Sequence, residues 1–478
     1  MIITATVLIY FAVLWAVSRL TARKSSNEAF FRAERKSPWY MVAFGMIGAS
    51  ISGVSFVSVP GMPVHINMYY LQMCLGFILG YFAIAFILLP IYYKLNLTTI
   101  YSYLKQRLGK KAYKTGASFF LLSKMTRAAV SFYVVCMLLH SFVFEALGIS
   151  FFIVVAAMVA LIWLYTHRGG VKTLVWTDTF QTLCLFGALI LIIMNVADAL
   201  GMTMGEAVKA IKGSSYSQVF LFDDWMSKQN FWKQFLSGVF VVVVMTGLDQ
   251  DMMQKNLTCR TLHQAQKNMI VNGLMYVPVN LLFLVLGVLL YDFAATHAIA
   301  LPSASDQLLP TLVGGGHLGE AAKICFVVGV TAAALSSADS ALTALTTSVT
   351  IDIMHRPSDE RLRRRVHIGV AVVLWLLVML LQAAGTGSVI NAVYVVASYT
   401  YGPLLGMFGL GLCTRNLRPR PWAVPLICVA SPMVCYALSA IAAAMFDYHF
   451  GYELLLLNGV VTAAALWLSS VHTSTPRQ

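Results

Sequence analysis

The stretch GMIGASISGVSFVSVPGMP, Gly45 to Pro63, places four glycines, four serines and two prolines inside one hydrophobic span. Glycine and proline are the residues that least favour a helix interior, so this run disfavours a continuous helix. Within a membrane protein, an interrupted helix leaves backbone carbonyl and N–H groups free to bind ions and solutes. The run therefore predicts a helix broken near its middle, with a kinked structural helix as the alternative.

The composition around this stretch indicates a membrane protein. Of the 478 residues, 59% are hydrophobic and 11% are charged, and the mean hydropathy is +0.77. Soluble domains carry about 25% charged residues. Apolar runs of about 20 residues, the length of a membrane-spanning helix, recur from end to end. We expect an all-α polytopic protein that is integral to a plasma (inner) membrane, with the lipid bilayer as its surroundings.

The hydrophobic runs divide the chain into about thirteen expected spans. No soluble domain is expected among them, and the chain ends at VHTSTPRQ, shortly after the last span. The spans are expected near 2–20, 39–62, 68–93, 117–145, 148–167, 173–200, 233–250, 268–292, 320–350, 366–385, 388–413, 421–446 and 451–470.

The lysines and arginines predict the orientation of these spans. With the N-terminus outside, 26 of the 33 basic residues fall in inner loops or the C-terminal tail. This asymmetry follows the positive-inside rule and predicts an N-out, C-in topology. The net charge of +14 is therefore spread between apolar runs, which argues against nucleic acid as a partner.

A second polar run, AAALSSADSALTAL from Ala332 to Leu345, lies within another long apolar stretch. Its hydroxyls fall on one helical stripe, formed by Ser336, Ser340, Thr343 and Thr347. Close helix packing explains small hydroxyl residues. It does not explain Asp339, because a carboxylate at membrane depth is costly and faces a partner or an aqueous cavity. Adjacent serines and the carbonyl of Ala333 supply oxygens of the kind that hard cations bind.

Further charges lie inside other apolar runs. In GGVKTLVWTDTFQ, Asp178 is expected about two turns inside the membrane, as part of an ion site or proton relay. In SKMTRAAVSFY, Lys124 is close enough to the inner end to reach the interface, whereas Arg127 is deeper. The planar fork of Arg127 suits a carboxylate ligand. The alternative is an internal ion pair with Asp178 or Asp339.

The segment GLDQDMMQK, Gly247 to Lys255, is expected to end a helix with its charges facing the cytoplasm, in a gate or loop. At this point the chain resembles the sodium:solute symporter family, which includes sodium-coupled sugar, proline and sialic acid transporters. The resemblance rests on AAALSSADS, GGVKTLVWTDTFQ, SFVSVPG, DQDMMQK, DQLLP and YGPLLGMFGLG.

The resemblance implies a LeuT-like fold, in which two inverted five-helix repeats follow a leading helix. Residues 1–478 would then form one transmembrane transporter domain. Its parts would be a leading helix at 2–20, repeats at 39–200 and 233–413, and two C-terminal helices at 421–470.

The resemblance also implies two kinds of sodium site. The main site would take the carbonyls of Gly48, Ile51 and Ala333 and the hydroxyls of Ser336 and Ser337. A second sodium, held in some members beside the aspartate of the TD motif, would bind at Asp178, Ser336, Asp339 and Ser340. Asp339 stands where sialic acid members have serine. It would strengthen that second cation site, couple a proton, or pair with Arg127.

The implied solute site lies beside the broken helix. Arg127 matches the arginine that holds the carboxylate in sialic acid members, and Tyr70 matches an aromatic residue. Cys74 stands where those members have glutamine. The residues expected to bind solute are Ser50, Ser52, Ser55, Tyr70, Cys74 and Arg127.

The expected function is symport by alternating access, with one or two Na⁺ ions importing a small carboxylate-bearing solute. Sialic acid is the leading candidate, and a sugar or another organic acid is the alternative. A channel or a non-transporting solute sensor is the alternative of a different class, but no filter sequence or output domain is evident. No enzyme activity and no obligatory protein partner are expected.

Overall fold

The structure is a computed structural model that describes residues 2–21, 26–302, 304–314, 316–384, 386–414 and 416–472. The side chains of 386–398 and 472 are not included. Four of the basic residues used to predict the orientation, Arg23, Lys24, Arg415 and Arg477, lie outside the described residues.

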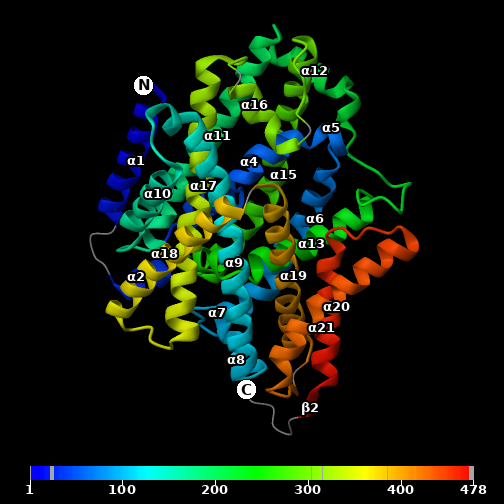
Figure 1. The fold of residues 1–478 in the computed structure, drawn as a ribbon. Helices are drawn as coiled ribbons and strands as arrows, with labels where there is room; N and C mark the ends of the chain where they lie inside the picture. Colours follow the sequence, from blue (N-terminus) through cyan, green and yellow to red (C-terminus); the bar gives the residue numbers. More distant parts are fainter. Residues whose placement is uncertain are drawn as a thin grey trace.

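The first part of the chain is a succession of helices up to residue 199 (Figure 1). The segments α6 and α7 join through a π-helical turn at Ile84–Leu88, so they form one continuous helix. These helices are α1 (Ile2–Thr21), α2 (Asn27–Arg32), α3 (Trp39–Ser50), α4 (Gly53–Ser58), α5 (Pro63–Ile66), α6 (Tyr70–Ala83), α7 (Leu89–Lys94), α8 (Ser102–Arg107), α9 (Lys110–Leu139), α10 (Phe151–Thr166) and α11 (Val171–Ala199).

The second part is also helical and ends in a short antiparallel strand pair, in which Leu417 is paired with His472. That pair joins the segment before α20 to the segment after α21. The elements are α12 (Met204–Gly213), α13 (Phe231–Val242), α14 (Gln250–Asn256), α15 (Leu262–Thr296), α16 (Leu308–Gly314), α17 (Gly319–Ser348), α18 (Glu360–Ala384), α19 (Thr386–Cys413), β1 (Leu417–Pro419), α20 (Ala423–Phe446), α21 (Glu453–Leu468) and β2 (Ser470–His472).

Each range expected to span the membrane contains a helix. Among the described residues, eight helices are long and apolar enough to cross a membrane, or up to ten if each of two bent pairs counts as one span. The helices α10 and α21 are apolar but shorter. The fold is therefore that of a multi-pass membrane protein.

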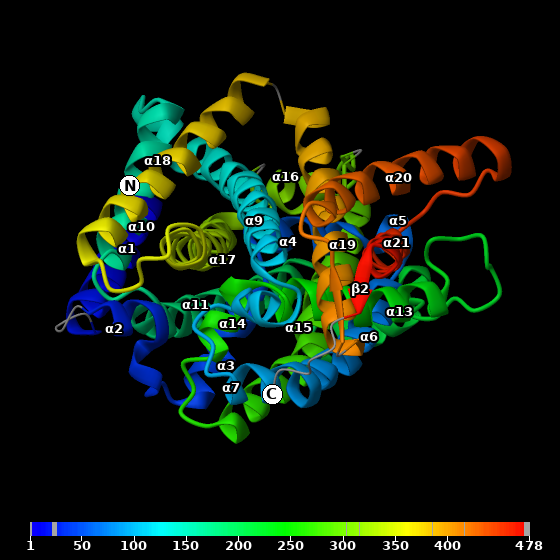
Figure 2. The same cartoon turned by 90° about the horizontal axis from the view of Figure 1, so that it is seen from below.

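The helix α17 runs through the interior of the molecule. From Thr331 to Ser348, every side chain except Ser337 is buried. Small alanine, serine and threonine side chains allow neighbouring helices to approach this closely. The helices α4, α9 and α11 pack against α17, whereas α20 and α21 lie on the far side of the molecule (Figure 2).

Two breaks interrupt the helices around α17. The axis turns by 62° between α3 and the helical segment Gly53–Gly61, which contains α4. It turns by 70° between Phe231–Gly247, which contains α13, and α14. The second bend directs α14 into the interior, where all seven of its residues are buried.

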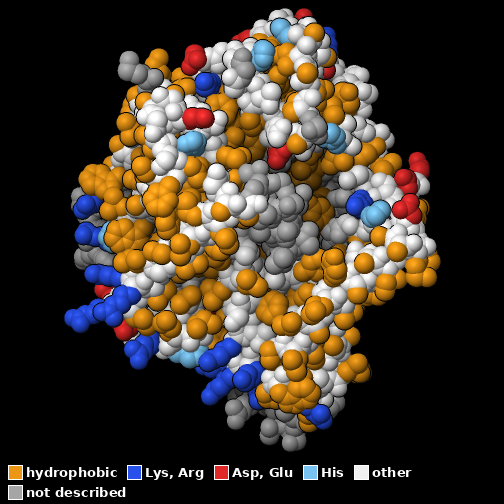
Figure 3. All heavy atoms as spheres, viewed as in Figure 1, with side chains coloured by type: hydrophobic (Ala, Val, Ile, Leu, Met, Phe, Trp, Pro, Cys, Tyr) orange, Lys and Arg blue, Asp and Glu red, His pale blue; other side chains and the backbone are white. Residues whose placement is uncertain are grey.

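The surface separates apolar and basic residues. Hydrophobic side chains cover much of the flank seen in Figure 3, while most of the visible lysine and arginine side chains gather toward its lower end. In Figure 1 that end carries α2, α8 and the connection from α17 to α18.

Candidate functional site

The break between α3 and α4 lies next to α17. Ile51 and Ser52 are extended, with φ/ψ of −92°/101° and −73°/160°. The Ser52 hydroxyl accepts a hydrogen bond from the N–H of Ser55 at 3.2 Å and thereby caps α4. The break predicted within Gly45–Pro63 is therefore present, and its cause is local, since Ser52 caps a new helix that begins three residues after α3 ends.

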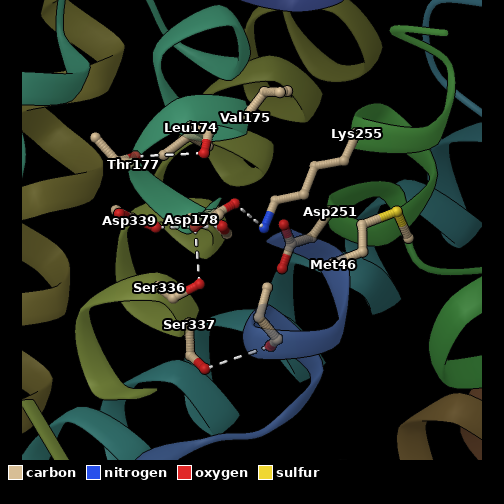
Figure 4. A network of polar contacts seen from close by, with 12 residues as sticks. Met46, Leu174, Val175, Thr177, Asp178, Asp251, Lys255, Ser336, Ser337 and Asp339 are labelled. Atoms are coloured by element: carbon tan, nitrogen blue, oxygen red, sulfur yellow. Dashed lines mark hydrogen bonds and ion pairs between the residues drawn. The ribbon is translucent and has the colours of Figure 1, made fainter. Parts of the chain in front are cut away.

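The hydroxyls of Ser336 and Ser337 on α17 point to different partners (Figure 4). Ser337 Oγ lies 3.1 Å from the carbonyl oxygen of Ala333 and 3.5 Å from that of Ala49, and so connects α17 to the end of α3. The carbonyl of Gly48 instead accepts the N–H of Ile51 at 3.1 Å. The residues expected for the main sodium site thus lie on the two facing segments, with the carbonyl of Ala49 added.

Ser336 points to the other expected cation site. Its hydroxyl donates to Asp178 Oδ1 at 2.8 Å. Asp339, one helical turn further along α17, accepts from Tyr165 at 2.6 Å and from Ser340 at 3.2 Å. The structure therefore brings together Asp178, Ser336, Asp339 and Ser340, all of which are buried.

The positively charged side chain of Lys255 contacts this group of acids and serines. Lys255 Nζ lies 2.8 Å from Asp178 Oδ2, and both side chains are 2% exposed (Figure 4). The expectation that the charges of GLDQDMMQK face the cytoplasm is wrong. The 70° bend before α14 turns Asp249, Asp251 and Lys255 into the interior, where each acid meets a cation.

Lys124 is the second buried amine. Its Nζ lies 2.6 Å from Asp251 and 3.4 Å from Asp249, and its side chain is 5% exposed. The expectation that Lys124 reaches the membrane interface is therefore wrong, because two carboxylates hold it inside. Asp249 also caps α14 by accepting the N–H of Asp251 at 2.9 Å, and it accepts the hydroxyl of Tyr401 at 2.9 Å.

A cavity adjoins both the helix break and this charged group. Arg127, Lys124 and Asp251 line it together with the serines at the break. Arg127 is close enough to Asp251 for their charges to interact. The lining residues are Ala49, Ser50, Ser52, Phe77, Tyr81, Lys124, Arg127, Ala128, Ser131, Val241, Val242, Met245, Thr246, Asp251, Met252, Tyr276, Ser337 and Ala341.

The solute residues expected from the sequence are only partly brought together. Ser50, Ser52 and Arg127 line the cavity, whereas Ser55, Tyr70 and Cys74 do not. Ser55 instead lies 3.1 Å from Ser52 through their hydroxyls. Cys74 is fully buried on α6.

Close packing of α3 on α11 sets the distance between the break and Asp178. A Cβ at Gly48 would lie 2.0 Å from Thr182 Oγ1, and one at Gly45 would lie 2.9 Å from Asp178 Cβ. Glycine at these two positions therefore allows the end of α3 to approach the acid on α11.

Sequence reasoning missed Lys255, Ala49 and Tyr165. No clear signal marked Lys255, because the helix break before α14 was itself not predicted. Its partner was not readable, since the direction of α14 after the break decides which acid the ammonium meets. Tyr165 lies on α10 in an apolar context that gives no sign of Asp339 as its partner.

Helices broken inside the protein, beside buried charges and a polar cavity, are the construction of secondary transporters. The model of the sodium:solute symporter family matches residues 30–418, and the chain belongs to that family. Its relatives are sodium-coupled transporters, not enzymes, and sodium is their coupling ion.

The similar proteins carry different solutes. The human (Homo sapiens) sodium/iodide cotransporter is 25% identical over 84% of this chain, and the sodium-dependent multivitamin transporter of Oryctolagus cuniculus is 26% identical over 83%. The chain spans 63% of the length of each of these two relatives. The sodium/sialic acid symporter NanT of Aliivibrio fischeri is 24% identical over 95% of this chain and 91% of its own.

The fold is also that of a solved transporter. A substrate-bound, outward-open sodium-coupled sialic acid symporter matches with a TM-score of 0.83 and 18% identity, over 99% of both chains. Mhp1, a nucleobase-cation-symport transporter, matches with a TM-score of 0.56 and 14% identity, over 93% of this chain and 94% of its own. The LeuT-like transporter architecture expected from the sequence is therefore confirmed at the level of the fold.

Proposed function

We propose that this protein is a sodium-coupled symporter that imports a small carboxylate-bearing solute by alternating access, with sialic acid as the leading candidate. The observation that carries the proposal is the cavity, which Arg127 lines together with the serines of the α3–α4 break and Ser337 of α17. A guanidinium binds a carboxylate through two parallel hydrogen bonds, which fixes both its charge and its orientation.

The proposal includes an arrangement in the membrane. Residues 1–478 form one transporter domain of about thirteen spans, with inverted repeats at 39–200 and 233–413 and two further helices at 421–470. Both bent pairs, α3–α4 and α13–α14, begin one of these repeats, as expected for related halves with a site at their interface. The basic end of the molecule faces the cytoplasm, which gives an N-out, C-in topology in a plasma (inner) membrane (Figure 3).

Sodium acts between α3 and α17. It binds among the carbonyls of Gly48, Ile51 and Ala333 and the hydroxyls of Ser336 and Ser337. The contact of Ser337 with Ala49 supports this position, because it already brings the two segments within reach of one small ion. An ion at this point orders the helix break, and the break carries Ser50 and Ser52 of the solute site. Sodium therefore prepares the cavity for solute.

Asp178, Ser336, Asp339 and Ser340 form a candidate second cation site, which is supported by their proximity in the structure. Solute binding is assigned to Arg127, Ser50 and Ser52, with Ser55, Tyr70 and Cys74 as residues that join the site in another state of the cycle. A neutral sugar is the less favoured solute, because it offers no carboxylate to the guanidinium of Arg127.

The test is uptake by the purified protein in liposomes. Labelled sialic acid should accumulate under an inward sodium gradient and should not accumulate when potassium replaces sodium. Ser337→Ala should raise the sodium concentration needed for half-maximal uptake without lowering the amount of folded protein. Uptake that is independent of sodium would contradict symport, whereas sodium-driven uptake of another acid would contradict only the choice of sialic acid.

A further inference from the structure

Lys255 reaches the candidate second sodium site at Asp178. Its Nζ is 2.8 Å from Asp178 Oδ2, and its side chain is as buried as the carboxylate it meets. In Figure 4 the ammonium group points from α14 to Asp178, and Asp251 lies beside it. The ammonium also interacts electrostatically with Asp339. Lys255 thus supplies a fixed positive charge to both acids of the candidate site.

The oxygens of that site already have partners in the chain. Of the two carboxylate oxygens of Asp178, one accepts from Ser336 and the other faces Lys255. Those of Asp339 accept from Tyr165 and Ser340. A hard cation needs several oxygen ligands at once, and here it would have to share Asp178 with the ammonium of Lys255, which lies 2.8 Å from Oδ2.

We propose that the Lys255 ammonium is a built-in cation that takes the place of a second sodium, so that the transporter couples a single Na⁺. This inference rests on the proposed sodium coupling. It assigns the one transported ion to the main site at the α3–α4 break. Asp178 and Asp339 then serve as the counter-ions of Lys255 and do not bind a transported ion.

The charges of the region agree with this assignment. Four buried acids, Asp178, Asp249, Asp251 and Asp339, accompany three cationic side chains, Lys124, Arg127 and Lys255. In their ionised forms, and before a carboxylate solute binds, they leave one negative charge, which one sodium ion balances. A second sodium placed beside Asp178 would lie next to the ammonium of Lys255, and two like charges in a buried site repel each other strongly.

A purely structural role for Lys255 predicts something different. An ion pair that only joins α14 to α11 would affect stability when removed, but it would leave the number of sodium ions bound unchanged. The change in the number of ions bound per chain when Lys255 is replaced therefore separates the two roles, and it requires no knowledge of the solute.

The experiment measures ²²Na⁺ binding to the full-length purified protein, corrected for binding in excess potassium. The wild type should bind one ion per chain. Lys255→Met should bind two, because removal of the ammonium leaves Asp178 and Asp339 as two uncompensated acids. Lys255→Arg keeps a cation and should bind one. The double variant Asp178→Asn/Lys255→Met removes the acid together with the amine and should also bind one.

Each outcome of the binding measurement either supports or overturns the inference about Lys255. A wild type that binds two ions overturns the inference but leaves sodium coupling intact, as does a folded Lys255→Met that binds one. A wild type that binds none overturns both the inference and the proposed function. Should Lys255→Met fail to fold, Lys255→Gln, which keeps a polar side chain without the charge, takes its place, with two ions in support of the inference and one against it.

Discussion

Arg127 is the residue on which the choice of solute depends. A hydrogen bond to a charged group contributes about 1.5–3 kcal/mol, so Arg127→Ala should weaken binding of a carboxylate solute by roughly tenfold or more. Arg127→Lys keeps the charge but loses the planar fork, and it should recover only part of that affinity. The measurement is calorimetric binding of sialic acid in saturating sodium.

The control for Arg127→Ala is the stabilisation of the protein by sodium in the absence of solute. The stabilisation of Arg127→Ala by sodium alone should match that of the wild type, because Arg127 faces the cavity and the proposed ion lies at the helix break. If Arg127→Ala still binds sialic acid with wild-type affinity, then Arg127 interacts with the carboxylate of Asp251 and does not bind the solute.

Gly48 also has a steric role, separate from the expected role of its carbonyl as a sodium ligand. Its missing side chain would lie 2.0 Å from Thr182 Oγ1, and that hydroxyl is held by a 2.6 Å hydrogen bond to the carbonyl of Asp178. Gly48→Ala should therefore destabilise the protein by about 1–3 kcal/mol, the usual cost of overpacking. Thr182→Ala should partly rescue it in a double-mutant cycle.

Thermal unfolding in detergent provides the measurement for Gly48. Gly187 is the matched control, since it lies on α11 and a Cβ there meets nothing within 4 Å. Equal midpoints for Gly48→Ala and Gly187→Ala would mean that α3 can move away from α11 without cost.

Individual residues differed in how well the sequence predicted them. Asp178, Ser336, Asp339 and Ser340 were grouped as one site because the family resemblance implied it, and the structure brings them together. Lys255 was placed in a loop. Its long side chain contacts whichever acid lies in the direction that α14 takes after the break. No residue spacing in the sequence indicates that direction.

At the scale of secondary-structure elements, α14 depends on its charges. It is buried throughout, and the cation for Asp249 and Asp251 comes from Lys124 on α9. Removal of one partner from a buried ion pair costs about 3–5 kcal/mol, because an uncompensated charge stays inside. Lys124→Met should therefore lower stability by about that amount, as measured by thermal unfolding.

A second substitution separates charge from packing. Lys124→Met/Asp251→Asn removes both members of the closest pair and should regain much of the lost stability. Lys209→Met, on the exposed face of α12, is the control and should change little. If the double variant is no more stable than Lys124→Met, then the lysine stem rather than its charge supports α14.

The elements themselves were largely predictable, and their directions were not. Apolar run length predicted a helix at every expected range, and the glycine–serine run predicted the α3–α4 break. The break before α14 was missed, because GLDQDMMQK contains neither proline nor a second glycine and reads as a polar helix end. Its 70° turn depends on contacts with α9, α11 and α17, which lie far away in sequence.

At the scale of the whole molecule, the sodium site and the cavity share the α3–α4 break, so the two ligands should bind cooperatively. Saturating sodium should tighten solute binding by a certain factor, and saturating solute should tighten sodium binding by the same factor. Couplings of this kind are about 5–150-fold. Sodium should also raise the unfolding temperature in a concentration-dependent way, because it binds only the folded protein.

This reciprocity is measurable with two titrations on one preparation. Solute affinity is determined with sodium and with potassium, and sodium affinity with and without solute. Because the two factors describe one thermodynamic cycle, they must agree if the same ion and solute occupy the protein together. A solute affinity that does not change when potassium replaces sodium would mean that the α3–α4 break does not couple the two sites, and the cavity would then belong to a sodium-independent carrier.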